Sequence, residues 1–287
     1  MAGRLRETYR RYLGVGRMVP RGDHREPSAT AGRSPRWEPV AWPLVSLGGA
    51  ICFWQIAVRW SGTTVFPLPI DVARGLGELL HKGLLWSYVG DSLLRVAAGY
   101  SLAVLCGIPA GLLLGWYPLA GTSANPVIQM LRPISPLAWI PLAIVWFGTG
   151  NLAAIFLIFL AAFFPIVVSA MNGVRDVPAM YRQAGENFGL STAGLLRRVV
   201  FPAALPQVLV GLRIALGVAW LVIVAAEMIA VTSGLGYLII DARNAGKRYD
   251  LVIAGMLLIG VIGLALDLGI RRLEGVKSVR WGFRNEG

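Results

Sequence analysis

The chain has 287 residues, of which 56% are hydrophobic and 15% are charged, and its net charge is +12. A soluble protein of this size carries about 25% charged residues, so this composition excludes an ordinary soluble domain. The apolar residues form blocks and most charges lie in the tails and loops between them, so the positive charge does not predict nucleic-acid binding. We therefore predict an all-α polytopic membrane protein.

The two ends of the chain are predicted to be tails. Residues 1–38 hold nine arginines and almost no large apolar cluster, which favours a basic, disordered cytoplasmic tail over a signal peptide. A transit peptide is an alternative that Glu7, Asp23 and Glu26 weaken. Residues 39–275 are predicted to form the transmembrane domain, and residues 276–287 a second cytoplasmic tail.

Six apolar stretches approach the roughly 20 residues needed to cross about 30 Å of hydrocarbon. Residues 61–90 form a mixed connector, in which residues 73–85 fit a short helix at the membrane interface. Gly and Ala are dense in residues 99–115, which indicates close helix packing. The predicted spans are residues 40–60, 92–116, 126–147, 151–172, 204–231 and 250–270.

The distribution of positive charge predicts the orientation of these spans. With the N-terminus inside, 18 of the 27 Lys and Arg residues fall in inner segments and six fall in outer segments. We therefore expect both termini to face the cytoplasm. The inner segments are residues 1–38, 117–125, 173–203 and 271–287, and the outer ones are 59–90, 148–150 and 232–249.

The third span has an unusual sequence, LRPISPLAWIPLAIVWFGTG at residues 131–150. Proline removes a backbone donor and clashes with the preceding turn, so the span is predicted to be broken and packed against other helices. Broken helices often line a transport path, and an intramembrane arginine is a functional candidate by default. Arg132 either lines such a path or extends to the headgroups. The candidate path residues here are Arg132, Pro133, Ser135, Pro136 and Trp139.

Two further charges inside the predicted spans are candidates for the same path. Arg213 lies about ten residues into the fifth span, where it either faces the path or pairs with a residue such as Asp267. Glu227 lies toward the outer end of that span. For Glu227 we favour an ion pair, with Arg95 as the suggested partner, over contact with a solute.

The long inner loop VRDVPAMYRQAGENFGLSTAGLLRRVVFPAALP, residues 174–206, has a helical pattern with one apolar side. Pro178 and Pro202 lie near its two ends, where proline predicts a helix boundary, and Gly189 fits a turn between two short helices. An inert connector rarely needs two amphipathic helices. We therefore interpret the loop as a docking element for a cytoplasmic partner.

This loop resembles the signature loop of binding-protein-dependent ABC importer permeases. That signature reads Glu-Ala-Ala, three residues, Gly, nine residues, Ile, one residue, Leu-Pro. The spacing is kept in full here, with Gln for Glu, Gly for the second Ala, Val for Ile and Phe for Leu, and the acidic residue Glu186 follows the triplet. The resemblance assigns coupling to an ATPase subunit to Gln183, Ala184, Gly185, Glu186, Gly189, Val199, Phe201 and Pro202.

The resemblance covers roughly residues 40–275. Residues 131–150, 211–230 and 234–244 are similar to the branch that contains nitrate, sulfonate, taurine and bicarbonate permeases. It implies the type I importer permease fold, also called MetI-like, in the bacterial inner membrane. The implied partners are a second copy of the chain, two ATPase subunits that use ATP and Mg²⁺, an extracytoplasmic solute-binding protein and membrane lipid.

The sequence contains no G-x-x-x-x-G-K-[ST] phosphate loop, so we expect this chain to bind no nucleotide or other cofactor and to be a non-catalytic transport subunit. No paired carboxylates, His cluster or nucleophile constellation supports a catalytic or metal site. An ion-gradient-driven secondary transporter and a structural membrane subunit are the alternatives. The two arginines favour an anionic solute, with nitrate, sulfonate, taurine and bicarbonate all left open.

Overall fold

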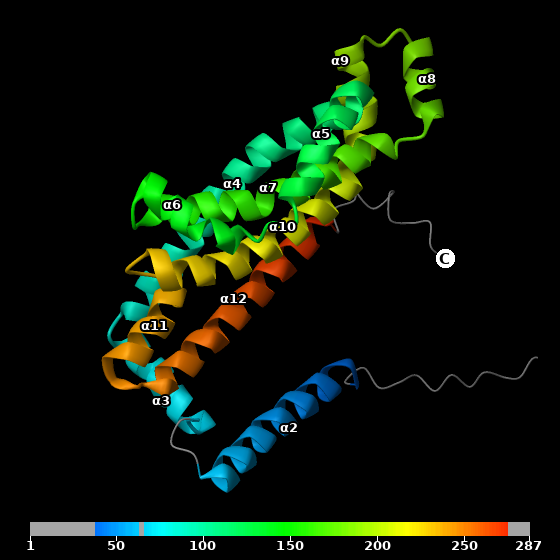
Figure 1. Cartoon of the computed structure of the whole chain (residues 1–287). Coiled ribbons are helices and arrows are strands. Elements are labelled where there is room, and N and C mark those ends of the chain that lie inside the picture. Colours follow the sequence, from blue (N-terminus) through cyan, green and yellow to red (C-terminus); the bar gives the residue numbers. More distant parts are fainter. Residues whose placement is uncertain (1–37, 63–65, 275–287) are drawn as a thin grey trace, which may run out of the picture. The chain divides into compact units, whose positions relative to one another are not determined.

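The structure is a computed structural model that describes residues 38–62 and 66–274 (Figure 1). The basic tail expected at residues 1–38 therefore lies outside the described residues apart from Glu38, and so does the tail expected at 276–287. The chain divides into two compact units, residues 1–52 and 53–287. All secondary structure in the described residues is helical, as the composition predicted.

The helices follow one another with short connections. The first unit holds most of α2 (Glu38–Ser61), whose Leu44–Ser61 stretch is apolar enough to cross a membrane. The remaining elements belong to the second unit. They are α3 (Pro69–His81), α4 (Leu84–Trp116), α5 (Pro118–Leu131), η1 (Pro136–Trp139), α6 (Ile140–Phe147), α7 (Asn151–Arg175), α8 (Ala179–Asn187), α9 (Thr192–Leu195), η2 (Leu196–Val200), α10 (Phe201–Ala230), α11 (Leu235–Gly246) and α12 (Tyr249–Glu274).

The described residues contain five or six of the predicted spans. Five helices in the described residues are long and apolar enough to cross a membrane, and α5 with residues 136–147 makes a sixth span if this bent pair counts as one. The axes of the pair differ by 81° across a short break. The third span is therefore broken, as its prolines predicted.

The helices differ from the prediction at several places. Helix α4 begins at Leu84 rather than at residue 92, because the left-handed Gly83 (φ 68°) separates it from α3. The expected turn at 117–125 is mostly the start of α5, which Pro118 opens as a first-turn proline. The outer segment 232–249 contains α11, whose buried positions recur at helical spacing. These positions are Leu235, Leu238, Ile239 and Ala242.

The core of the second unit lies where α4, α7 and α10 pack together. Helix α4 contributes a stripe of small buried residues at every fourth position. A Cβ added at Gly111 would lie 2.5 Å from the Val167 carbonyl oxygen, so the two helices meet backbone to backbone. This packing confirms the prediction for residues 99–115. The stripe consists of Gly99, Ala103, Gly107, Gly111 and Gly115.

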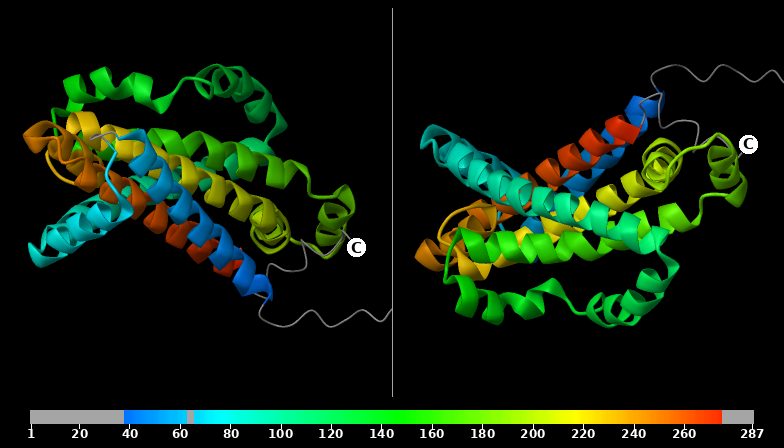
Figure 2. Two further views of the ribbon diagram at one scale, coloured as in Figure 1. Left: turned by 90° about the horizontal axis from the view of Figure 1, so that it is seen from below. Right: turned by 90° about the horizontal axis from the view of Figure 1, so that it is seen from above.

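Connections of the second unit gather at two opposite ends (Figure 1). Helices α8 and α9 lie at one end, beside the junction of α4 and α5, and α3 and α11 lie at the other. Both views of Figure 2 place the broken span along one side of α7. The loops therefore alternate between the ends as the predicted topology requires.

An ion cluster ties α3 to the start of α12. The Arg248 guanidinium donates to Glu78 at 2.7 Å and to Asp250 at 2.7 Å, and Lys82 donates to the other Glu78 oxygen at 2.6 Å. The hydrogen bond from Arg248, followed by that from Lys82, lowers the pKa of Glu78 to about 2. This carboxylate therefore keeps its negative charge toward both cations at neutral pH.

Candidate functional site

The broken span forms one wall of a recess. Helix α5 ends at Leu131, and Pro133 follows its last turn. The Ser135 hydroxyl accepts a hydrogen bond from the Leu137 backbone N–H at 3.3 Å and so caps η1, whose first residue is Pro136. The prolines thus stand at the places where one helix stops and the next begins.

The recess has a volume of about 250 Å³ and lies between this span, α7 and α10. Arg132 is its charged lining residue, and Trp139 and Phe164 are aromatic ones. The wall is otherwise mostly apolar. A small anion can therefore reach the exposed Arg132 guanidinium beside a mostly apolar wall. Lining residues include Arg132, Pro136, Trp139, Ala161, Phe164 and Val218.

The structure brings together only part of the predicted path set. Arg132, Pro136 and Trp139 line the recess, whereas Pro133 and Ser135 are exposed beside it and are not among its lining residues. Arg213 lies on another side of α10, where its Nε donates to Asp267 at 2.8 Å. The suggested Arg213–Asp267 pair is confirmed, and Arg271 shares the same carboxylate.

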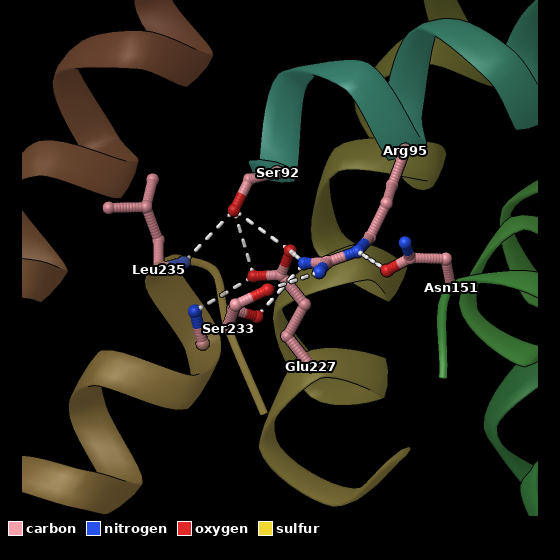
Figure 3. Close-up of polar contacts among 7 residues, drawn as sticks. Ser92, Arg95, Asn151, Glu227, Ser233 and Leu235 are labelled. Carbon is pink, nitrogen blue, oxygen red and sulfur yellow. Dashed lines mark hydrogen bonds and ion pairs between the residues drawn. The ribbon is translucent and has the colours of Figure 1, made fainter. Parts of the chain in front are cut away.

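A buried polar network surrounds Glu227 near the α11 end of the bundle (Figure 3). Glu227 is 0% exposed and Arg95 is 5% exposed, and Arg95 Nη1 donates to Glu227 Oε1 at 2.6 Å. The ion pair suggested from the sequence is confirmed. Glu227 is not among the residues lining the recess around Arg132.

The remaining hydrogen bonds in Figure 3 connect four helices. The Ser92 hydroxyl donates to the Glu227 carboxylate and accepts from the Leu235 N–H at 2.9 Å. The Gly236 N–H donates to Glu227 Oε2 at 3.0 Å, and Arg95 donates to Asn151 and Ser233. The network holds the α10–α11 connection against α4 and the start of α7.

Sequence reasoning missed Ser92, Asn151 and Ser233 as members of this network. A partial signal existed, because Ser92 lies three residues before Arg95 and so shares its face of the helix. Asn151 is the first residue of α7, and Ser233 lies in the α10–α11 connection. No spacing in the chain indicates that they meet Arg95.

The inner loop has the predicted arrangement of two short helices around Gly189. Gly189 has φ 75° and its N–H donates to the Glu186 carbonyl at 2.8 Å, while the Leu190 N–H donates to the Gly185 carbonyl at 3.1 Å. This pair of bonds is the Schellman motif, which ends α8 and needs a left-handed residue. Ser191 then caps α9 by accepting from the Gly194 N–H.

Gly185 explains one departure from the signature triplet. It is buried against the following helix, and an added Cβ would lie 2.5 Å from Leu195 Cδ1 and 3.4 Å from Val199 Cγ2. Alanine does not fit this spacing unless Leu195 moves. Helix α8 therefore packs closely on α9 and η2 through a position without a side chain.

The other signature residues divide between the surface and the interior of the loop. Gln183, Ala184 and Glu186 are exposed on α8, and Phe188 after it is 86% exposed. Val199 and Phe201 are partly buried, and Pro202 is an exposed residue in the first turn of α10. The exposed apolar and polar side chains of α8 form a surface that a protein can contact.

The described residues contain no group of three or more His, Cys, Asp or Glu side chains that could hold a metal ion. Cys52 and Cys106 are both free. The long apolar helices, the broken span and the two-helix loop define a polytopic helical membrane protein.

Comparison with known structures supports this class. A chain of the MetNI methionine ABC transporter, solved in inward-facing conformations, matches 67% of this chain and 95% of its own length with a TM-score of 0.59 at 20% identity. At this identity the likeness shows the fold alone. The fold is that of an ABC importer permease of the MetI-like type, as the resemblance implied.

Sequence comparison then shows the family. Residues 104–275 match the binding-protein-dependent transport system inner membrane component family, to which this chain belongs. It is 42% identical to the taurine transport system permease of Escherichia coli strain K12, over 66% of this chain and 69% of the relative. It is 38% identical to a bicarbonate transport system permease of Synechococcus elongatus, over 85% and 89%. The chain is thus the non-catalytic membrane subunit of an ABC importer.

Proposed function

We propose that this permease forms the membrane path for a small anionic solute, which an extracytoplasmic binding protein delivers. The observation that carries the proposal is Arg132 at a mostly apolar recess beside the broken span. A guanidinium in a low-dielectric setting attracts an anion more strongly than it does in water. The relatives named for taurine and bicarbonate transport solutes that carry an anionic group, and nitrate and other sulfonates belong to the same chemical class.

The first experiment replaces Arg132 in the complex reconstituted into proteoliposomes with binding protein and ATP. Arg132→Ala should lower solute uptake at least about tenfold, the effect of about 1.4 kcal/mol, while basal ATP hydrolysis stays close to normal. Arg132→Lys should retain part of the uptake, because it keeps the charge and loses the planar fork of donors. Uptake is measured with labelled taurine, bicarbonate, nitrate and an alkanesulfonate.

The matched control is Arg213→Ala, which removes an equal charge from the Arg213–Asp267 pair outside the recess. It should change uptake much less than Arg132→Ala does. Normal uptake by Arg132→Ala, or equal losses in both variants, would rule out a specific role for Arg132 in holding the solute.

We further propose that the α8–α9 end faces the cytoplasm and that α8 docks on a separate ATPase subunit, which binds the ATP and Mg²⁺. The excess of Lys and Arg in the segments at this end supports the orientation. The exposed Gln183, Glu186 and Phe188 support the docking surface. Two copies of this chain, two ATPase subunits and the binding protein would complete the importer in the bacterial inner membrane.

The turn at Gly189 offers a test of this docking. An added Cβ at Gly189 meets open space, so Gly189→Leu acts through backbone conformation, where a left-handed L-residue costs roughly 1–2 kcal/mol. We expect this strain to reorient α8 and to lower solute-stimulated ATP hydrolysis severalfold. Gly189→Asn is the control, because asparagine adopts the left-handed region more readily. Unchanged ATPase binding and coupled hydrolysis in Gly189→Leu would contradict the assignment.

A further inference from the structure

Besides its chain connections, helix α8 makes two contacts with the rest of the second unit that bear on its coupling to the core. The first is the close packing of Gly185 on Leu195, and it leads through η2 into α10. The second is the side chain of Arg182, which leads to α7 and α4. These two contacts reach all three helices of the main core.

Arg182 holds the end of α7 through backbone carbonyls. Its Nη2 donates to the Val174 carbonyl at 3.0 Å and to the Val177 carbonyl at 3.4 Å. Carbonyls at a helix C-terminus lack partners within the helix and carry partial negative charge. A guanidinium is therefore a favourable ligand for this end of α7.

The same guanidinium also lies over the ring of Trp116, the last residue of α4, at 5.9 Å from its centre. Trp116 packs against a small buried cluster formed by Val174, Val177, Val200 and Ala204. The guanidinium of Arg182 on α8 thus contacts two core helices, α4 and α7. A lysine ammonium has no planar face to stack on the ring, so it cannot make the ring contact and both hydrogen bonds in this way.

One donor of the Arg182 guanidinium has no partner. The Arg182 Nε is buried and makes no hydrogen bond within the described part of the chain. A buried donor without a partner lowers stability by about 1–3 kcal/mol. This cost offsets part of the stabilisation that the two carbonyl hydrogen bonds and the ring contact provide.

We propose that Arg182 is the positioning residue that transmits a displacement of α8 to α4 and that fixes the angle between α8 and the end of α7. Without it, α8 keeps its chain connection to α7 through residues 176–178 and its packing through Gly185 on α9, but it loses its contact with α4. Motion imposed on α8 then bends the chain at residues 176–178, and the core helices do not rearrange together. The inference rests on the proposed docking of α8 on the ATPase subunit.

The test measures solute molecules transported per ATP hydrolysed, with the complete complex in proteoliposomes at saturating ATPase subunit. Arg182→Ala should lower this ratio at least threefold while basal hydrolysis and ATPase binding stay within twofold of normal. Arg182→Lys should lower the ratio about twofold, and it decides the question if the alanine variant does not assemble. A normal ratio in the lysine variant, or in an assembled alanine variant, would overturn the proposal.

Two controls separate this role from general effects. Arg197→Ala removes an exposed arginine from η2 in the same loop and should leave the ratio normal. An equal loss in Arg197→Ala would show that loop charge, rather than the Arg182 contacts, sets the coupling. Trp116→Leu should lower the ratio, and combining it with Arg182→Ala should add little. Full additivity would contradict action through α4.

A cross-link distinguishes failure of this inference from failure of the docking proposal. Gln183→Cys, in a chain that lacks Cys52 and Cys106, should cross-link to a cysteine on the ATPase subunit because Gln183 is exposed on α8. If no ATPase cysteine gives a cross-link, the proposed docking of α8 is wrong, and the inference about Arg182 is then also wrong. A cross-link together with a normal ratio in Arg182→Ala would overturn only the role of Arg182.

Discussion

Glu227→Ala is expected to lower the free energy of unfolding by about 3–5 kcal/mol. The substitution leaves the buried Arg95 guanidinium without its carboxylate, and it removes an acceptor for Ser92 and for the Gly236 N–H. An uncompensated charge in a buried site is far more costly than the loss of an exposed pair. Thermal unfolding of the purified permease in a fixed detergent measures the effect.

Asp267→Ala is the matched control for this prediction. It breaks the Arg213–Asp267 pair, in which both side chains are about one-third exposed, so water can solvate the remaining cation. Its effect should be about 1 kcal/mol or less. The double variant Arg95→Met, Glu227→Leu should recover much of the lost stability, because it leaves no buried charge unpaired. Equal unfolding midpoints for Glu227→Ala and the normal protein would refute the structural role of this network.

Gly111→Val is expected to cost about 3 kcal/mol, at the upper end of the usual range for an overpacked core. The added Cβ would lie 2.5 Å from the Val167 carbonyl oxygen and 2.6 Å from Ala170 Cβ, and a backbone atom cannot move aside as a flexible side chain does. Helices α4 and α7 must therefore separate along their contact. The measurement is the SDS fraction that unfolds half of the protein in mixed micelles.

The control lies in the same helix. A Cβ added at Gly90 meets nothing within 4 Å, so Gly90→Val introduces the same side chain without a clash. We expect its unfolding midpoint to stay near that of the normal protein. If the two valine variants are equally stable, the close approach of α4 and α7 does not depend on the glycine stripe.

Much of the architecture could be predicted because a membrane restricts which secondary structures a chain can form within it. Backbone polar groups must be satisfied inside each span, so apolar length predicts helices, and prolines predict where a helix breaks. Gly189 was predicted as a turn because few other residues adopt a left-handed helix end. The boundaries of α4 and α5 and the existence of α11 were predicted less well, because interfacial helices mix polar and apolar residues and give weak hydropathy signals.

Single residues in the sequence do not determine which charges line the candidate path. Arg132 and Arg213 look alike as charges in apolar spans, yet one lines the recess and the other pairs with Asp267 on α12. Asp267 could be suggested as a partner, but nothing in the chain decides which of two roles a long cationic side chain takes. That choice depends on which face of α10 meets α12.

Four features could be predicted from the chain without its fold: the class of protein, its apolar spans, the broken third span and the two-helix loop with its Gly189 turn. Each of these follows from local composition, proline chemistry or short-range spacing. Helix packing alone brings Ser92, Asn151 and Ser233 to Arg95 around Glu227. It also brings Arg182 to Trp116 and to the end of α7. Those contacts join residues from separate helices and connections, and helix packing, not spacing along the chain, sets the distances between them.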